Sequence, residues 1–175
     1  MTYALIGDSQ ADGLAVPLAR MLPIDFSEPH VGWTTAAIFG DPLTRALASP
    51  ASTVLVVTGG NDDPLNATAF DNGIVRARSF GKQIVIVGPV FALTSDAPRH
   101  DRARVALGNA AQRNGLRFVD AYPLTRDLAN NSNVHLGPRY PDYALRLASG
   151  LKSSGGGAGP IIAGAVLAVL AWKFW

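Results

Sequence analysis

The chain has 175 residues, of which 48% are hydrophobic and 16% charged, and its formal net charge is +2. This composition excludes a disordered chain, which would be rich in charge and poor in the aliphatic residues that build a core. The absence of cysteine excludes disulfide scaffolds, thiolate metal sites and cysteine nucleophiles.

Strands and helices alternate along most of the chain. The predicted strands are apolar runs rich in β-branched residues, and the predicted helices carry apolar residues at helical spacing. In chain order the elements are strand 3–6, helix 10–22, a weaker strand 23–31, helix 34–48, strand 53–57, helix 65–80, strand 83–90, helix 99–114, strand 116–121 and helix 141–151. This alternation predicts a three-layer α/β domain with a mainly parallel sheet.

The two ends of the chain carry different signals. No basic segment precedes the first apolar run, so we expect no signal peptide and a folded domain over residues 1–152. Residues 153–159 have the composition of a flexible Gly/Ser-rich linker. Residues 160–175 begin with proline and carry no charge before Lys173, which predicts a hydrophobic helix.

The length of this last segment favours a membrane anchor. Sixteen helical residues span about 24 Å, and the flanking tryptophans and Lys173 help such a helix to fit a ~30 Å hydrocarbon core. We therefore expect a single-pass helix at the carboxyl terminus and a membrane-associated protein. The alternatives are burial of this helix in a homo-oligomer or larger assembly, and packing against its own domain.

Three polar clusters follow predicted strands, where open parallel α/β sheets form their sites. They are Gly7-Asp8-Ser9, Gly59-Gly60-Asn61-Asp62 and Asn133-Val134-His135-Leu136. A serine hydroxyl at a strand-to-helix turn is a nucleophile only if a base takes its proton, and His135 is the histidine in a suitable loop. The alternative roles are a helix N-cap for Ser9, a turn residue for Asn61 and a surface histidine for His135.

The other charged and histidine-bearing segments predict no site. His30 lies near a proline-containing edge segment and His100 on a charged helix, so neither is expected to be catalytic. The short basic runs at residues 76–78 and 99–104 are mixed with acidic or apolar residues. They predict solvated helix faces and no nucleic-acid partner. No cluster of metal ligands is apparent in the sequence, and we expect no cofactor.

These clusters, together with Gly32, resemble the ordered motifs of the SGNH (GDSL-type) hydrolases over roughly residues 3–151. The resemblance implies a flavodoxin-like α/β/α sandwich. It also implies Ser9 as nucleophile, His135 as base, and an oxyanion hole formed by the backbone amides of Ser9 and Gly32 and the side-chain amide of Asn61. Asp8 is expected to support the turn and not to react.

One position departs from this family pattern. The family carries an aspartate three residues before the histidine, and here that residue is Ser132. Either a Ser–His dyad operates, with a backbone carbonyl or a side chain such as Asn133 orienting the ring, or Asp127 or Asp142 substitutes for the aspartate. The third alternative is that catalysis has been lost, since an amide in place of the acid costs about 10⁴-fold in a serine protease.

The leading functional hypothesis is a membrane-anchored serine esterase that acts through an acyl-enzyme. Its substrate would be a small ester, with an acylated carbohydrate such as an O-acetyl sugar as one candidate. The alternative is a structural or adaptor protein in which an SGNH-like domain is tethered to a membrane or to a virus or phage particle. The departure at Ser132 and the apolar carboxyl-terminal segment motivate this alternative.

Overall fold

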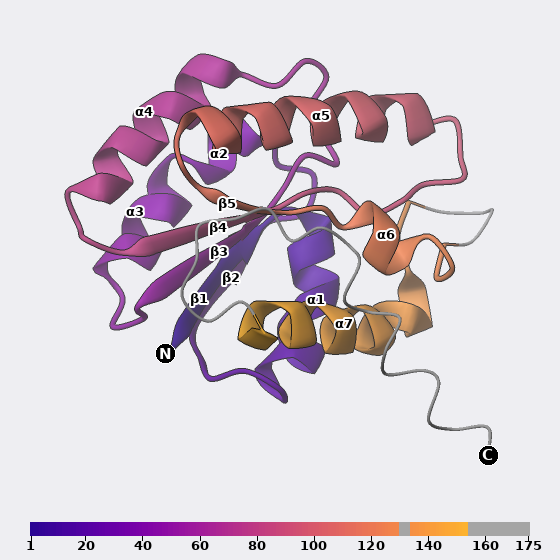
Figure 1. The fold of residues 1–175 in the computed structure, drawn as a ribbon, viewed down its shortest axis with the longest axis horizontal. Helices are drawn as coiled ribbons and strands as arrows, with labels where there is room; N and C mark the ends of the chain where they lie inside the picture. The colour runs from indigo at the N-terminus through magenta and orange to yellow at the C-terminus, as the bar shows by residue number, and fades with distance from the viewer. Residues whose placement is uncertain (130–133, 154–175) are drawn as a thin grey trace.

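The computed structural model describes residues 1–129 and 134–153 of the chain (Figure 1). Its five strands form one parallel sheet in the order β2-β1-β3-β4-β5. The strands are β1 (Tyr3–Gly7), β2 (Ile24–Pro29), β3 (Thr53–Val57), β4 (Gln83–Val87) and β5 (Arg117–Val119). The helices are α1 (Ser9–Ala19), α2 (Thr35–Ile38), α3 (Asp41–Ala48), α4 (Ala67–Arg78), α5 (Ala97–Arg113), α6 (Tyr122–Thr125) and α7 (Tyr140–Ser153), with a 3₁₀ turn η1 (Gly137–Arg139).

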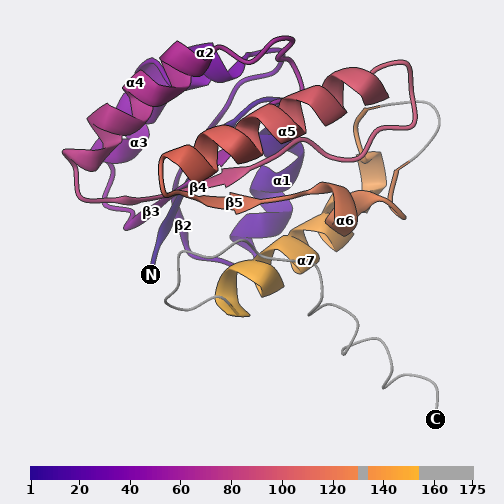
Figure 2. The ribbon, with the colours of Figure 1, turned by 45° about the horizontal axis from the view of Figure 1, so that its top comes forward.

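Helices cover both faces of the sheet, because successive strand residues point to opposite sides. Leu5, Leu55 and Val57 pack against α1 and α7 on one face. Ile6 and Val56 belong to the second buried cluster, against α2, α3, α4 and α5. Figures 1 and 2 show these two helical layers on opposite sides of the strands. The predicted three-layer α/β/α sandwich with a parallel sheet is confirmed.

Two of the differences from the predicted element boundaries have a clear cause in the sequence. The single helix predicted over residues 34–48 is two helices, α2 and α3, with Gly40 as the N-cap of α3 and Pro42 in its first turn. Proline has no N–H to continue the preceding helix, so the chain starts a new one there. The strand predicted over residues 83–90 ends at Val87, three residues early, since Gly88 and Pro89 follow it and proline cannot donate to a ladder.

The carboxyl-terminal prediction lies almost entirely outside the described residues. Helix α7 extends to Ser153, so the first residue of the predicted linker is helical. Residues 154–175, which include the predicted membrane helix, are not among those described. Of the helices in residues 1–129 and 134–153, none has the length and apolar character needed to cross a membrane. The anchor at residues 160–175 stays a prediction.

Candidate active site

Helix α1 follows the carboxyl end of β1 (Figure 1), and Ser9 is its first residue. The chain passes so close to β3 at this point that a Cβ on Gly7 would lie 2.0 Å from the Val57 carbonyl oxygen. Only glycine fits there. The following amide, that of Asp8, donates to the same carbonyl oxygen at 3.0 Å. The Gly7-Asp8-Ser9 motif thus fixes the start of α1 against the neighbouring strand.

The helix N-cap is Asp8 and not Ser9, so the alternative role predicted for the serine is wrong. Asp8 Oδ1 accepts from the backbone N–H of Gln10 at 2.9 Å. Ser9 is half-buried, and its hydroxyl makes no hydrogen bond within the part of the chain that the structure describes. It stands at the amino end of an 11-residue helix, where the helix dipole and unpaired amides favour negative charge.

Asp8 also joins the first motif to the second. Its Oδ2 accepts from the Gly60 backbone N–H at 3.2 Å, across 52 residues of sequence. The side chain is fully buried. Burial raises the pKa of Asp8 to about 6, because desolvation outweighs the amide hydrogen bonds that favour the carboxylate. Asp8 supports the turn, as its place in the sequence predicts.

Gly32 lies in a tight turn that follows β2. Its φ is +81°, and the Trp33 amide donates to the His30 carbonyl at 3.3 Å, as in a type II turn that requires glycine at this position. Within the described ranges the Gly32 amide donates to no protein acceptor. The amide is therefore open to a ligand on the exposed side of this turn.

Asn61 ties this turn to the loop after β3. Its Nδ2 donates to the Trp33 carbonyl oxygen at 3.0 Å. A side-chain amide carries two N–H donors, so one remains for another acceptor. The next residue, Asp62, accepts at 3.1 Å from the amide of Thr35, at the start of α2, and also from the Thr35 hydroxyl.

The contacts of Asp62 explain why it is structural. The Thr35 hydroxyl lies 2.8 Å from that of Thr58, which follows β3. Asp62 is 3% exposed, and burial raises the pKa of its carboxyl. Both of its carboxylate oxygens accept hydrogen bonds from Thr35. Asp62 therefore links the loop after β3 to the start of α2. Asn61 therefore does more than form a turn. Asn61 and Asp62 both bond to the segment that follows β2, through Trp33 and Thr35.

His135 stands just before η1 and α7, as the sequence predicts. It is half-buried, and its Nδ1 lies 3.3 Å from the Tyr140 hydroxyl oxygen. Tyr140 begins α7, and its ring packs against Gly13 of α1. No hydrogen bond joins Ser9 to His135 in the described structure, although hydrogen bonds of an active site often tighten only when substrate binds.

The acids predicted as substitutes for the absent aspartate are engaged by arginines. Asp127 accepts from both terminal nitrogens of Arg146, at 2.5 and 2.8 Å. This guanidinium lowers the pKa of the Asp127 carboxyl. Asp142 accepts from Arg139 Nε at 2.7 Å. The third candidate, Asn133, lies outside the described residues, as does Ser132.

His100 lies on the charged helix α5, as predicted, but its side chain is buried, so the solvated face predicted for residues 99–104 does not include it. It is 1% exposed, and its Nδ1 lies 3.1 Å from the Val90 carbonyl oxygen. Burial lowers the pKa of its imidazole. A Cβ on Gly60 would be 3.7 Å from His100 Nε2, so the ring lies behind the loop that carries Asn61. The sequence does contain a signal for this burial: His100 precedes Ala103 and Leu107 by three and seven residues, a spacing that puts all three on the buried face of α5.

His30 also lies closer to the site than the sequence indicates. Its backbone amide donates to the Gly7 carbonyl at 2.8 Å, at the same edge of the sheet as Ser9. Its ring stacks on Trp33 at a centroid distance of 3.8 Å. Its Nε2 is 2.8 Å from Glu28 Oε1. These contacts give His30 a structural role in the turn that carries Gly32.

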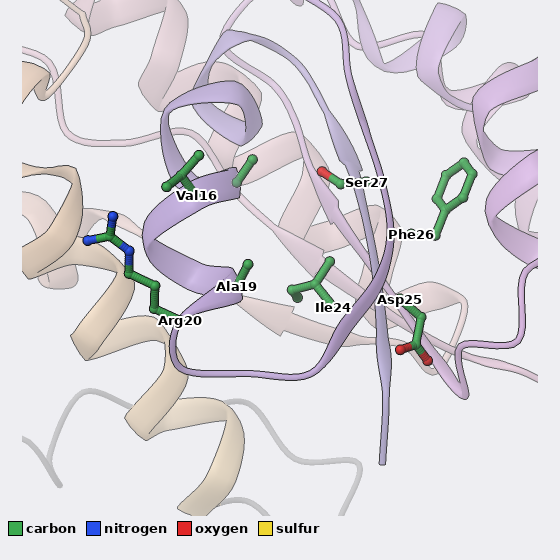
Figure 3. Close-up of a pocket in the computed structure, with 8 residues that line it drawn as sticks. Val16, Ala19, Arg20, Ile24, Asp25, Phe26 and Ser27 are labelled. Atoms are coloured by element: carbon green, nitrogen blue, oxygen red, sulfur yellow. The ribbon is translucent and has the colours of Figure 1, made fainter.

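The groove drawn in Figure 3 is separate from these residues. It lies between the last turns of α1 and the edge strand β2, and its lining includes Val16, Ala19 and Ile24. Ser9 is at the opposite end of α1, and none of the predicted site residues lines the groove. Within residues 1–129 and 134–153, no group of three or more potential ligands could hold a metal ion.

Comparison with known proteins gives a match at the level of structure. No family model matches the sequence, and no curated protein matches it. A GDSL-family lipolytic protein from Veillonella parvula superposes with a TM-score of 0.63 at 13% identity, covering 88% of this chain and 99% of its own.

Two further similar structures have named activities. The catalytic domain of the peptidoglycan O-acetyltransferase from Streptococcus pneumoniae has a TM-score of 0.61 at 17% identity, covering 87% of this chain and 92% of its own. An acetylxylan esterase from Geobacillus stearothermophilus, solved as a catalytic mutant, has a TM-score of 0.60 at 15% identity, covering 90% and 95%. The resemblance that the sequence motifs predict is confirmed for the fold: this chain has the fold of the SGNH (GDSL-type) hydrolases.

Proposed function

We propose that this chain is a serine esterase that cleaves a small acyl ester through an acyl-enzyme on Ser9. The observation that carries the proposal is the state of the Ser9 hydroxyl at the start of α1. Asp8, and not Ser9, caps this helix, and the Ser9 hydroxyl makes no hydrogen bond among the described residues. Two hydrogen bonds of the loop after β3, Gly60 to Asp8 and Asn61 to Trp33, also support it, because they link the segments that carry the proposed oxyanion donors.

The chemistry follows from these groups. Ser9 Oγ attacks the carbonyl carbon while Nε2 of His135 takes its proton. The new oxyanion is held by the amides of Ser9 and Gly32 and by the second N–H of Asn61. As the intermediate collapses, His135 returns the proton to the leaving alcohol and the acyl group stays on Ser9. His135 then takes a proton from water as the water oxygen attacks the acyl carbon. The second tetrahedral intermediate collapses by breaking the bond between the acyl carbon and Ser9 Oγ, and His135 gives its proton to Ser9 Oγ as the acid leaves.

O-acetylated carbohydrate is the substrate class to test first. An acetylxylan esterase and a peptidoglycan O-acetyltransferase domain share the fold of this chain. An acetyl group needs little room, and the turn around Gly32 is exposed. A short acyl chain on a large, solvent-exposed alcohol therefore suits this edge of the sheet better than a long acyl chain, which requires a deep apolar pocket.

The test is covalent trapping of Ser9 in the full-length chain, kept in mild detergent. Phenylmethylsulfonyl fluoride should add one sulfonyl group to the peptide that contains Ser9, and this should abolish hydrolysis of p-nitrophenyl acetate. Ser149, whose hydroxyl donates to the Leu145 carbonyl on the exposed side of α7, should stay unmodified. A chain that is neither modified nor active on nitrophenyl or O-acetyl-sugar esters contradicts the proposal and favours the tethered adaptor.

We further propose that residues 160–175 anchor the domain in a membrane. The support is the sequence: a proline start, a long apolar run and no charge before Lys173. Mixed with phosphatidylcholine vesicles and floated on a density gradient, the full chain should rise with the lipid. A chain ending at Ser153 should stay at the bottom. Equal behaviour of the two chains contradicts the anchor.

A further inference from the structure

The proposed mechanism requires His135 to hold one particular tautomer. A general base must present Nε2 without a proton, which requires the proton to sit on Nδ1 and to have an acceptor there. Asp127 and Asp142 are held by Arg146 and Arg139 and are both more than half exposed. Their carboxylates therefore serve surface ion pairs along α7.

Tyr140 provides an oxygen at the required atom. Its hydroxyl oxygen lies 3.3 Å from His135 Nδ1. Tyr140 is 7% exposed, so water competes little for this contact. Burial also raises the pKa of the phenol above its ordinary value, so the hydroxyl stays neutral through the physiological range.

Packing fixes the Tyr140 ring on the helix that begins with Ser9. A Cβ on Gly13 would lie 2.3 Å from two atoms of this ring, so Gly13 is the gap in α1 that receives it. Ser9 and Gly13 are four residues apart on α1, and such residues share one helix face. The tyrosine that contacts His135 is therefore seated on the face of α1 that carries the nucleophile.

We propose that Tyr140 is the positioning residue for His135, accepting the Nδ1–H so that Nε2 carries no proton and can accept that of Ser9. This inference rests on the proposed function for its catalytic meaning. The tyrosine directs the ring and its tautomer, as the family's aspartate does. It differs in carrying no charge to stabilise the imidazolium, so this chain should turn over more slowly than enzymes with a carboxylate at that atom.

The decisive measurement is the tautomer of His135, because it needs no turnover. Full-length protein labelled with ¹⁵N in histidine is recorded above the imidazole titration, and His135→Gln identifies the His135 signals. Wild type should show the proton on Nδ1. Tyr140→Phe should shift the population toward the proton on Nε2, since the acceptor oxygen is gone.

Tyr143→Phe is the matched control. Tyr143 lies in the same helix and is fully buried, and its hydroxyl has no hydrogen-bond partner in the described structure. This variant should keep the wild-type tautomer and hydrolyse esters within about twofold of wild type. Tyr140→Phe should lower kcat about 3- to 10-fold with little change in KM, the effect of losing one neutral hydrogen bond.

The two proposals fail separately in this experiment. An Nε2-protonated His135 in wild type, or an unchanged tautomer in Tyr140→Phe, overturns the role of Tyr140 even if the enzyme is active. An Nδ1-protonated His135 that depends on Tyr140, in a protein without esterase activity, supports the positioning and contradicts the proposed function.

Discussion

Replacing Ser9 with alanine is expected to lower kcat for ester hydrolysis by at least about 10³-fold, because no other group in the proposed mechanism can carry the acyl chain. What is left should be the contribution of binding and the oxyanion donors acting on water. The measurement is the steady-state rate on p-nitrophenyl acetate. The burst of nitrophenol released in the first turnover should also disappear.

The structure predicts that this variant folds normally. The cap of α1 is the Asp8 carboxylate, and the Ser9 hydroxyl makes no hydrogen bond within residues 1–129 and 134–153, so little stability is lost with it. Ser9→Ala should therefore unfold within a few degrees of wild type. Ser149→Ala, on the exposed side of α7, is the control and should keep full activity. An active Ser9→Ala enzyme rules out the serine mechanism.

The sheet was predictable because its signal is local. Each strand buried on both faces is a short apolar run, for example residues 53–57, and the helices between the strands predict parallel pairing. The break between α2 and α3 was missed even though Gly40 and Pro42 were visible. The apolar residues Ile38, Leu43 and Leu47 were interpreted as one helical face, and this hid the break.

The site was predictable as a set of motifs and not as a set of contacts. The Gly7-Asp8-Ser9 motif indicated the turn that carries the nucleophile. The hydrogen bond between Asp8 and Gly60, in contrast, spans 52 residues and depends on β1 and β3 being neighbours in the sheet. Tyr140 carried no motif signal, since its importance comes from the gap at Gly13 in another helix. The burial of His100 was not predicted, because the arginines of its helix indicated a solvated face.

Replacing Asn61 is expected to have the second-largest effect on the rate of ester hydrolysis. Asn61→Ala should lower kcat about 10²- to 10³-fold with a small change in KM, because the lost N–H acts on the oxyanion and not on the ground-state carbonyl. The bond from Nδ2 to the Trp33 carbonyl, at 3.0 Å, directs the remaining N–H of the amide. The same substitution also releases the loop after β3 from the turn that carries Gly32. Both consequences lower the rate.

Asn66→Ala separates the loss of a catalytic donor from a general loss of stability. Asn66 is the N-cap of α4, and its side chain accepts from the Ala69 amide at 3.0 Å. Losing this cap should cost about 1 kcal/mol of stability, yet kcat should remain within about twofold of wild type, since the Asn66 side chain bonds to the first turn of α4 and has no proposed role in catalysis. Urea titration and steady-state rates on the three proteins give both quantities. If Asn61→Ala loses no more activity than Asn66→Ala, the side-chain amide of Asn61 is not an oxyanion donor, and the hole consists of the Ser9 and Gly32 amides alone.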